Sequence, residues 1–245
     1  MAPSIRVHKN EQLDNLALAG EDLEKTLSSL HFINRLFGCH RQLINAVIDT
    51  VVDDDELLQN IVGQIAGDEN TIRITDLGSG GGDCILELNK RFAKNDIVVN
   101  FTGIDGNPNS TQLARNRSNY LNTRFITHDI LAEEFRVPSS DVVISSHFIY
   151  RFDDMALVAF LKKLKSTSTR SIIFSDLRRS KLSMFLFKWL RHLLPISNMA
   201  KTDRLTAIQR SFSIEEMCKI IELSGISNYQ VIKKPWFRML VKINL

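Results

Sequence analysis

Residues 71–88, which read TIRITDLGSGGGDCILEL, constrain the fold more than any other stretch of this chain. The β-branched and apolar residues at 72–77 predict a short buried parallel strand, and a cluster of glycines follows it directly. Residues 83–88 then have the apolar spacing and the acidic first turn of a helix N-terminus. A strand, a glycine loop and a helix in this order are typical of a nucleotide-binding site.

The glycine loop has to turn sharply and to present main-chain N–H groups at the positive end of the following helix. It lacks the Gly-Lys-Ser/Thr ending of a phosphate loop. Asp83 stands where the dinucleotide pattern G-x-G-x-x-G needs its third glycine. What does fit is an acidic residue that ends the strand, followed by glycines at every second position: Asp76, Gly78, Gly80 and Gly82. An ordinary tight turn between strand and helix remains the alternative.

This pattern resembles motif I of the class I S-adenosylmethionine-dependent methyltransferases. The resemblance implies a loop that wraps the amino-acid half of the cofactor and carries no pyrophosphate, so the missing lysine is expected. It also implies an α/β fold with a Rossmann-like, seven-stranded sheet that is mostly parallel and has an antiparallel C-terminal strand. We expect this methyltransferase domain to span residues 67–245, behind an N-terminal helical cap at 1–66.

Composition places the chain among ordinary soluble proteins, with 245 residues, 44% hydrophobic and 24% charged. Its three cysteines, Cys39, Cys84 and Cys218, are scattered, which favours reduced thiols over a disulfide framework or a zinc site. The start of the chain lacks an apolar core of signal-peptide length, and no segment approaches the roughly 20 apolar residues of a membrane span. We therefore expect a cytoplasmic protein with no integral membrane segment and no bound metal.

Before the first strand, apolar residues at helical spacing predict one or two amphipathic helices over residues 11–37, with Gly38 as a stop. Further helices are predicted at 41–52 and 54–66. In the family that the chain resembles, such helices often cap the cofactor cleft; the alternative is that they only pack, with solvated polar faces. The polar residues available in such a cap are His31, Asn34, Arg35 and His40.

Residues 97–104 predict the second strand, which ends in Asp105. An acidic residue about 20 positions beyond the loop can accept hydrogen bonds from both ribose hydroxyls, and the family has an acidic residue there. Gly106 and Asn107 follow it, and Pro108 opens a helix predicted to cover residues 110–120. A plain surface turn is the alternative for Asp105.

Residues 123–127 predict a third strand, followed by Asp129 and Ile130. In the family, an acidic and an apolar residue at this place contact the amino group and the face of the adenine; a helix-capping Asp129 is the alternative, and His128 is expected to point away. Residues 141–146 predict a buried fourth strand. The candidate cofactor-binding residues are Asp76, Gly78, Ser79, Gly80, Gly82, Asp105, Gly106, Asn107, Asp129, Ile130 and Ser145.

The exit of the fourth strand, residues 147–152, lies where ligands of open α/β sheets bind. Many relatives that act on small molecules have a His-His pair near the end of this segment, whereas this chain has Tyr150-Arg151 there and His147 slightly earlier. We therefore take His147 and Tyr150 as candidate general bases. A packed or hydrogen-bonded structural histidine is the alternative for His147.

Beyond a helix at 156–164 and a fifth strand at 170–176, the alternation of strands and helices implies a parallel, doubly wound sheet. The strongly apolar tract at 182–194 then breaks the pattern, and it carries Lys188, Arg191 and His192. Three interpretations stay open: a lid over the acceptor within an insertion at 178–212, a plain core helix, or a helix in contact with a membrane surface.

The chain closes with a predicted helix and two predicted strands. Ser213 and Glu216 have capping-box spacing for a helix that runs to residue 223 and stops at Gly225. Residues 229–234 and 236–244 predict two strands joined at Pro235. A final antiparallel pair is how a methyltransferase sheet differs from a dinucleotide-binding one.

Charge is distributed unevenly along the chain, since residues 170–245 hold 14 Lys and Arg against 5 Asp and Glu, whereas the whole chain is only +3. A cationic environment predicts an acceptor with negative charge, either free or attached to an acidic carrier protein; solvated helix faces are the alternative. The cations around the apolar tract are Arg178, Arg179, Lys181, Lys188 and Arg191.

In the stretches DLRRSKLSMFLF and DRLTAIQRSFS the chain is most similar to bacterial small-molecule methyltransferases of polyketide, quinone-like or pigment pathways. The resemblance implies methyl transfer from S-adenosylmethionine to an oxygen, or else a carbon, of a small aromatic or polyketide-like acceptor. A non-catalytic protein that binds the cofactor or a partner is the alternative. RNA methylation is disfavoured, and no nucleic-acid partner is expected, because the net charge is modest and no RNA-binding module is evident.

Overall fold

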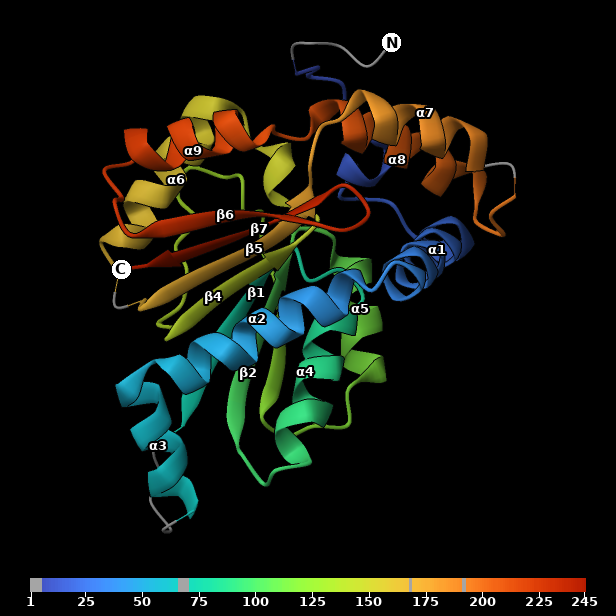
Figure 1. Ribbon diagram of the computed structural model, residues 1–245. Helices are drawn as coiled ribbons and strands as arrows, with labels where there is room; N and C mark the ends of the chain where they lie inside the picture. Colours follow the sequence, from blue (N-terminus) through green and yellow to red (C-terminus); the bar gives the residue numbers. More distant parts are fainter. Residues whose placement is uncertain (1–5, 66–70, 168, 191–192) are drawn as a thin grey trace.

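The computed structural model describes residues 6–65, 71–167, 169–190 and 193–245. Its centre is one seven-stranded sheet in the order β3-β2-β1-β4-β5-β7-β6, with helices on both faces (Figure 1). The first five strands are parallel, and β7 runs antiparallel to both β5 and β6. The strands are β1 (Ile72–Leu77), β2 (Val99–Asp105), β3 (Thr123–Thr127), β4 (Val142–Ser146), β5 (Ser171–Leu177), β6 (Tyr229–Lys234) and β7 (Arg238–Asn244).

The predicted fold class is confirmed, and the helices fall into two layers and an outer group. One apolar cluster joins α2, α3, α4 and α5 to one face of the sheet, and a second joins α6 and α9 to the other. The α-helices are α1 (Gly20–Leu36), α2 (Cys39–Asp53), α3 (Asp55–Ile65), α4 (Asp83–Ala93), α5 (Pro108–Arg117), α6 (Asp154–Lys165), α7 (Lys181–Leu190), α8 (Asn198–Arg210) and α9 (Ile214–Leu223), with short 3₁₀ turns at Gln12–Asp14 and Ile149–Arg151.

A third apolar cluster lies outside both layers, where α7 and α8 meet the buried side of α1. It contains Ile33 of α1, Met184 and Phe187 of α7, and Ala207 and Ile208 of α8. In Figure 1 these helices sit together at one end of the sheet, beside the carboxyl ends of the parallel strands. Helix α1 and the helices after β5 therefore pack together at the edge where ligands of such sheets bind.

The capping box predicted for α9 is present. The Ser213 hydroxyl accepts from the Glu216 N–H at 3.2 Å, and the Glu216 carboxylate accepts from the Ser213 N–H at 2.8 Å. Each side chain thus satisfies a backbone donor that the first turn leaves without a helical partner. The helix ends where it was predicted to, with Gly225 at φ 76°.

The N-terminal helix predicted over residues 11–37 is shorter than expected. A 3₁₀ turn covers Gln12–Asp14, and α1 begins only at Gly20. Between them the Asn15 side chain accepts from the Ala17 N–H at 3.0 Å, and the Leu18 carbonyl accepts from the Asn107 side chain at 2.9 Å. This local and long-range bonding holds the segment outside a helix, although its apolar spacing is helical.

Some predicted features lie outside the described residues, namely Arg191, His192 and the end of the helix predicted at 54–66, where α3 is described to Ile65. The helix predicted at 110–120 is Pro108–Arg117, because the Asn107 side chain caps it by accepting from the N–H groups of Asn109 and Ser110. Among the described helices, none has the length and apolar character needed to cross a membrane.

Candidate active site

A cleft of about 350 Å³ lies at the carboxyl ends of the central strands. Strand β1 has β2 on one side and β4 on the other, so the connections run in opposite directions on either side of this point. Crevices at such a switch point are where open α/β sheets bind ligands. The cleft is lined by the glycine loop, by the ends of β2 and β4, and by residues of the N-terminal segment and of α1 and α2.

The glycine loop is held in one conformation by backbone contacts to β2. The N–H groups of Gly78 and Ser79 both donate to the Ile104 carbonyl, at 2.9 and 3.0 Å. Gly78 has φ 72°, and a β-carbon there would lie 2.5 Å from the Phe148 ring. Gly82 has φ 79° at the start of α4, where a β-carbon would lie 2.8 Å from the Phe125 ring. The sequence therefore needs glycine at both positions for conformation and for space.

Asp105 connects the end of β2 to the glycine loop. Its carboxylate accepts from the Gly80 N–H and from the Asn107 N–H, each at 2.9 Å. Burial raises the pKa of this carboxyl, and the two backbone hydrogen bonds act in the opposite direction. Asp105 lines the cleft beside Gly106 and Asn107, at the place predicted for a ribose-binding acid.

Asp76, at the end of β1, is a buried acid with an unused oxygen. Only 2% of the residue is exposed, and within the described part of the chain its Oδ1 has no hydrogen-bond partner. Burial, and secondarily the charge of Asp105, raise its pKa to about 8. A carboxylate that opens onto a cleft without a donor of its own is a fitting partner for a cationic ligand group.

The raised pKa of Asp76 predicts how the free energy of unfolding depends on pH. Because the pKa of Asp76 is raised in the folded state from 3.8 to about 8, its contribution is fully present below pH 3.8 and is lost as the pH rises through 8. Asp76→Asn should therefore flatten the decline of the free energy of unfolding over that window. Urea unfolding of the ligand-free wild type and variant between pH 3.8 and 8 measures the free energy of unfolding of each. If the two free energies changed with pH in the same way, the raised pKa of Asp76 would be contradicted.

The N-terminal segment closes one end of the cleft. Leu16 packs over Gly106, where an added β-carbon would lie 2.9 Å from its side chain. The segment is anchored by Arg6, which donates to the carbonyls of Arg210, Tyr150 and Phe152 at 2.7, 3.0 and 2.8 Å. Arg6 also pairs with Asp154 and stacks 3.7 Å from the centre of the Phe212 ring.

The helical cap contributes three of its four predicted polar residues to the cleft. His31, Asn34 and His40 line it, whereas Arg35 lies in an adjoining groove. His31 Nδ1 is 3.2 Å from the carboxylate of Asp83, and Asn34 Nδ2 is 3.2 Å from His40 Nε2. Burial, aided by the charge of Arg238, lowers the pKa of His40 to about 4, so its ring is neutral at physiological pH.

Most of the predicted cofactor-binding residues line this cleft, but Gly82 and Ser145 do not. Ser145 is buried in the sheet and its hydroxyl donates to the Leu77 carbonyl at 2.8 Å, while the next residue, Ser146, lines the cleft. Successive residues of a strand face opposite sides, so Ser146 faces the cleft and Ser145 does not. The predicted residues that line the cleft are Asp76, Gly78, Ser79, Gly80, Asp105, Gly106, Asn107, Asp129 and Ile130.

Asp129 caps a turn, and it also lies in the wall of the cleft. Its carboxylate accepts from the Leu131 N–H at 3.0 Å, which caps the turn, and the residue also lines the cleft beside Ile130. His128 is exposed and its ring packs beside Phe135, with the ring centres 5.1 Å apart. The ring of His128 is not part of the cleft wall, as expected.

His147 reaches the cleft, but its basic nitrogen already has a donor. Arg204 Nη1 lies 3.0 Å from His147 Nε2, so Nε2 accepts, and Nδ1 lies 3.6 Å from Asp176 Oδ1. Burial, and then the charge of Arg204, lower the pKa of His147 to about 3. The ring is therefore neutral, and its orientation is fixed. The backbone of His147 has φ 61°, a conformation uncommon outside glycine.

Tyr150 does not line the cleft. It is buried, and its hydroxyl donates to Glu11 Oε2 at 2.8 Å. Burial raises the pKa of the Tyr150 hydroxyl, which makes it a poor base at neutral pH. Neither residue proposed as a general base thus presents a free basic atom to the cleft in this structure.

The sequence missed an ionic cluster on the same wall. Arg210 Nη1 lies 2.5 Å from the Asp14 carboxylate and 3.4 Å from Glu11, and Arg151 Nε lies 3.4 Å from Asp14. Burial raises the pKa of Glu11 to about 7. Nothing in the sequence motifs pointed to Glu11 or Asp14, because the partners come from distant segments that only packing brings together.

Comparison with known proteins agrees with this geometry. Residues 74–169 match the family described as a methyltransferase domain. A comparison with curated protein sequences finds no significant match.

Solved structures resemble the chain at low identity. The plantazolicin methyltransferase BamL, in complex with a triazolic desmethylPZN analogue and SAH, has a TM-score of 0.58 and 16% identity over 88% of this chain and 77% of that one. Magnesium protoporphyrin IX methyltransferase (ChlM) from Synechocystis PCC 6803, with bound SAH, has a TM-score of 0.52 and 17% identity over 84% and 83%. Human N-acetylserotonin methyltransferase, with SAM, has a TM-score of 0.52 and 14% identity over 97% and 63%.

At these identities the likeness establishes the fold, and the family match covers residues 74–169 within that fold. The motif that predicted a methyltransferase, residues 76–82, lies within the matched stretch, and Asp76 and residues 78–81 line the cleft. Residues 74–169 match the methyltransferase domain family, and the chain has the fold of the class I S-adenosylmethionine-dependent methyltransferases.

Proposed function

We propose that this protein transfers a methyl group from S-adenosylmethionine to an oxygen, or else a carbon, of a small aromatic or polyketide-like acceptor. The observation that carries the proposal is Asp76, whose buried carboxylate has an unpartnered oxygen beside the glycine loop. A ligand with an ammonium group supplies the missing donor. Three of the similar solved structures hold SAM or SAH, which supports the same cofactor here.

The residues of the cleft suit each part of that cofactor. Asp76 and the loop at 78–80 would hold its amino-acid half. Asp105 would accept from its ribose hydroxyls, and Asp129 with Ile130 would hold the adenine. The cofactor supplies a methyl group already activated by its sulfonium, so the protein has mainly to align the acceptor and exclude water.

The acceptor would lie against the wall formed by His147, Phe148 and Arg151. Because Arg204 occupies His147 Nε2, we assign His147 a positioning role. A base is needed only for a hydroxyl of high pKa, so a phenolic acceptor suits this wall. Tyr150 supports the wall through its hydrogen bond to Glu11.

The acceptor has a route into the cleft. A groove of about 830 Å³ adjoins it and shares four lining residues with it: His31, Asn34, His40 and Asp83. The groove is also lined by Phe37 and Trp236, whose ring centres are 4.9 Å apart. An aromatic acceptor fits such walls. Arg178, Arg179 and Lys181, three of the cations for which the sequence suggested an anionic acceptor, do not line the cleft or the groove.

The test is mass spectrometry of adenosyl ligand retained by the purified protein, followed by assay with methyl-labelled S-adenosylmethionine and a panel of phenols. We expect bound SAM or SAH, label in a phenol, and no competition by NAD or ATP, since the loop lacks the groups that hold their phosphates. His147→Asn should keep kcat within about tenfold; a loss of about 10² to 10⁴ would instead identify a general base. Cofactor binding without turnover on any acceptor would favour the non-catalytic alternative.

A further inference from the structure

Helix α7 is the outermost helix of the end cluster, and it is covered on one side only. Met184 and Phe187 are 3% and 8% exposed and pack with residues of α8 and α1. Figure 1 shows α7 along the outer edge of the molecule, beyond α8. The opposite face of the helix is apolar and uncovered, with Leu182, Phe185, Leu186 and Trp189 between 37% and 73% exposed.

These exposed residues form one continuous stripe. Their spacing places them one above another over the length of the helix, since residues three and four apart share a helix face. Leu193, just beyond α7, is 80% exposed. Single exposed apolar side chains are ordinary, whereas a contiguous group that includes an exposed tryptophan marks an interaction surface.

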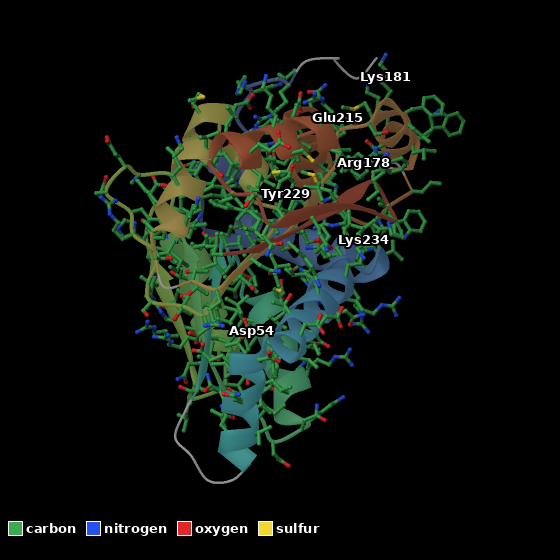
Figure 2. The ribbon with its side chains drawn as sticks, turned by 60° about the vertical axis from the view of Figure 1, so that its left-hand side comes forward. Asp54, Arg178, Lys181, Glu215, Tyr229 and Lys234 are labelled. Atoms are coloured by element: carbon green, nitrogen blue, oxygen red, sulfur yellow. The ribbon has the colours of Figure 1, made fainter. Side chains whose placement is uncertain are left out.

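The charge beside this stripe has a single sign. Between Asp176 and Asp203 the sequence contains no Asp or Glu and six Lys or Arg. On α7 itself Lys181 and Lys188 are both exposed, and Figure 2 shows Lys181 at the outer edge of the molecule. An apolar stripe of Trp, Phe and Leu flanked only by cations is the composition of helices that lie in a lipid headgroup region.

We propose that α7 binds the surface of a membrane that contains anionic lipids. The stripe enters the boundary between headgroups and acyl chains, and Lys181 and Lys188 reach the lipid phosphates. The helix lies on the membrane and does not cross it, in agreement with the absence of a spanning helix among the described residues. This surface is separate from the methyl-transfer site, because none of the residues that line the cleft comes from α7.

A membrane fits this surface better than a protein does. In a two-fold dimer built on the stripe, the lysines of both copies would face one another without acidic partners on the helix. The cleft and the adjoining groove also have no lining residue from α7. A flat, adaptable lipid interface requires no complementary hollow.

The test is sedimentation of the full chain with vesicles of phosphatidylcholine alone and of phosphatidylcholine mixed with phosphatidylglycerol. We expect binding to the mixed vesicles only, weakening as salt rises. Lys181→Gln with Lys188→Gln should lower the partition coefficient about thirtyfold, and Phe185→Ser with Trp189→Ser by more than about tenfold. Met155→Ser, which alters a side chain 69% exposed on α6, is the matched control and should bind like wild type.

A second readout reports the depth of the helix. The chain has two tryptophans, so Trp236→Phe leaves Trp189 as the only one, and its emission should shift to the blue on anionic vesicles. Absence of binding, equal binding to both vesicles, or an unshifted Trp189 would each overturn the proposal. Binding to a protein without binding to vesicles would also overturn the proposal. That result would be either a concentration-dependent dimer or capture of a purified acidic carrier protein, abolished in each case by Trp189→Ser. Cofactor affinity and thermal unfolding of the variants at Lys181 and Lys188, at Phe185 and Trp189, and at Met155 should match wild type, which separates this test from that of methyl transfer.

Discussion

Replacing Asp105 by Ala is expected to weaken S-adenosylhomocysteine binding by about 1.5 to 3 kcal/mol, or about 10- to 150-fold. The variant loses the proposed acceptor for the ribose hydroxyls. It also loses the two hydrogen bonds by which the carboxylate holds the Gly80 and Asn107 N–H groups, both at 2.9 Å. Two kinds of contact therefore disappear together, and isothermal titration calorimetry measures the sum.

Two companion variants make this result interpretable. Asp105→Asn keeps an oxygen acceptor but removes the charge, so its affinity should fall between those of wild type and Asp105→Ala. Asp96→Ala makes the same chemical change at an exposed residue in the turn before β2 and should bind as wild type does. Unchanged affinity in Asp105→Ala would remove Asp105 from the ribose site and leave it only a role in the loop.

Much of the candidate cofactor site was predictable because its parts are local in sequence. Asp76 is the last residue but one of β1, and Asp105 ends β2. Parallel strands bring their carboxyl ends to one edge, so strand order alone places these acids together. Gly78 and Gly82 were predictable because the chain must turn there with positive φ. In contrast, the sequence did not indicate that Ser146, and not Ser145, faces the cleft. A strand buried on both faces is a continuous apolar run, which does not reveal the face on which each residue lies.

The acceptor side depends on contacts between distant segments, and sequence patterns could not supply it. His147 and Arg204 are 57 residues apart, and Tyr150 and Glu11 are 139 apart. A general base at His147 was a fair hypothesis from its place after β4. Only packing showed that an arginine occupies its nitrogen. The same holds for α7. The sequence did not decide between a lid, a core helix and a helix in contact with a membrane, whereas the exposed fractions of its side chains distinguish the covered face from the exposed stripe.

Replacing Gly78 by Ala should be among the most damaging single changes in the glycine loop. Its φ of 72° costs a residue with a side chain about 1 to 2 kcal/mol, and its β-carbon would lie 2.5 Å from the Phe148 ring and 2.8 Å from the Phe148 Cβ. Overpacking adds about 1 to 3 kcal/mol. Together these lower the thermal midpoint by about 5 to 15 °C, and the displaced loop should lose most of its cofactor affinity.

The neighbouring Gly81 provides the matched control. It has no positive φ, and an added β-carbon would meet only the end of the Arg117 side chain, at 2.8 Å, which can move aside. Gly81→Ala should therefore keep its thermal midpoint within about 2 °C and nearly full cofactor affinity. Thermal unfolding and calorimetry on both variants decide the matter. If Gly78→Ala and Gly81→Ala behaved alike, the packing of Phe148 against the loop would not be what fixes its shape.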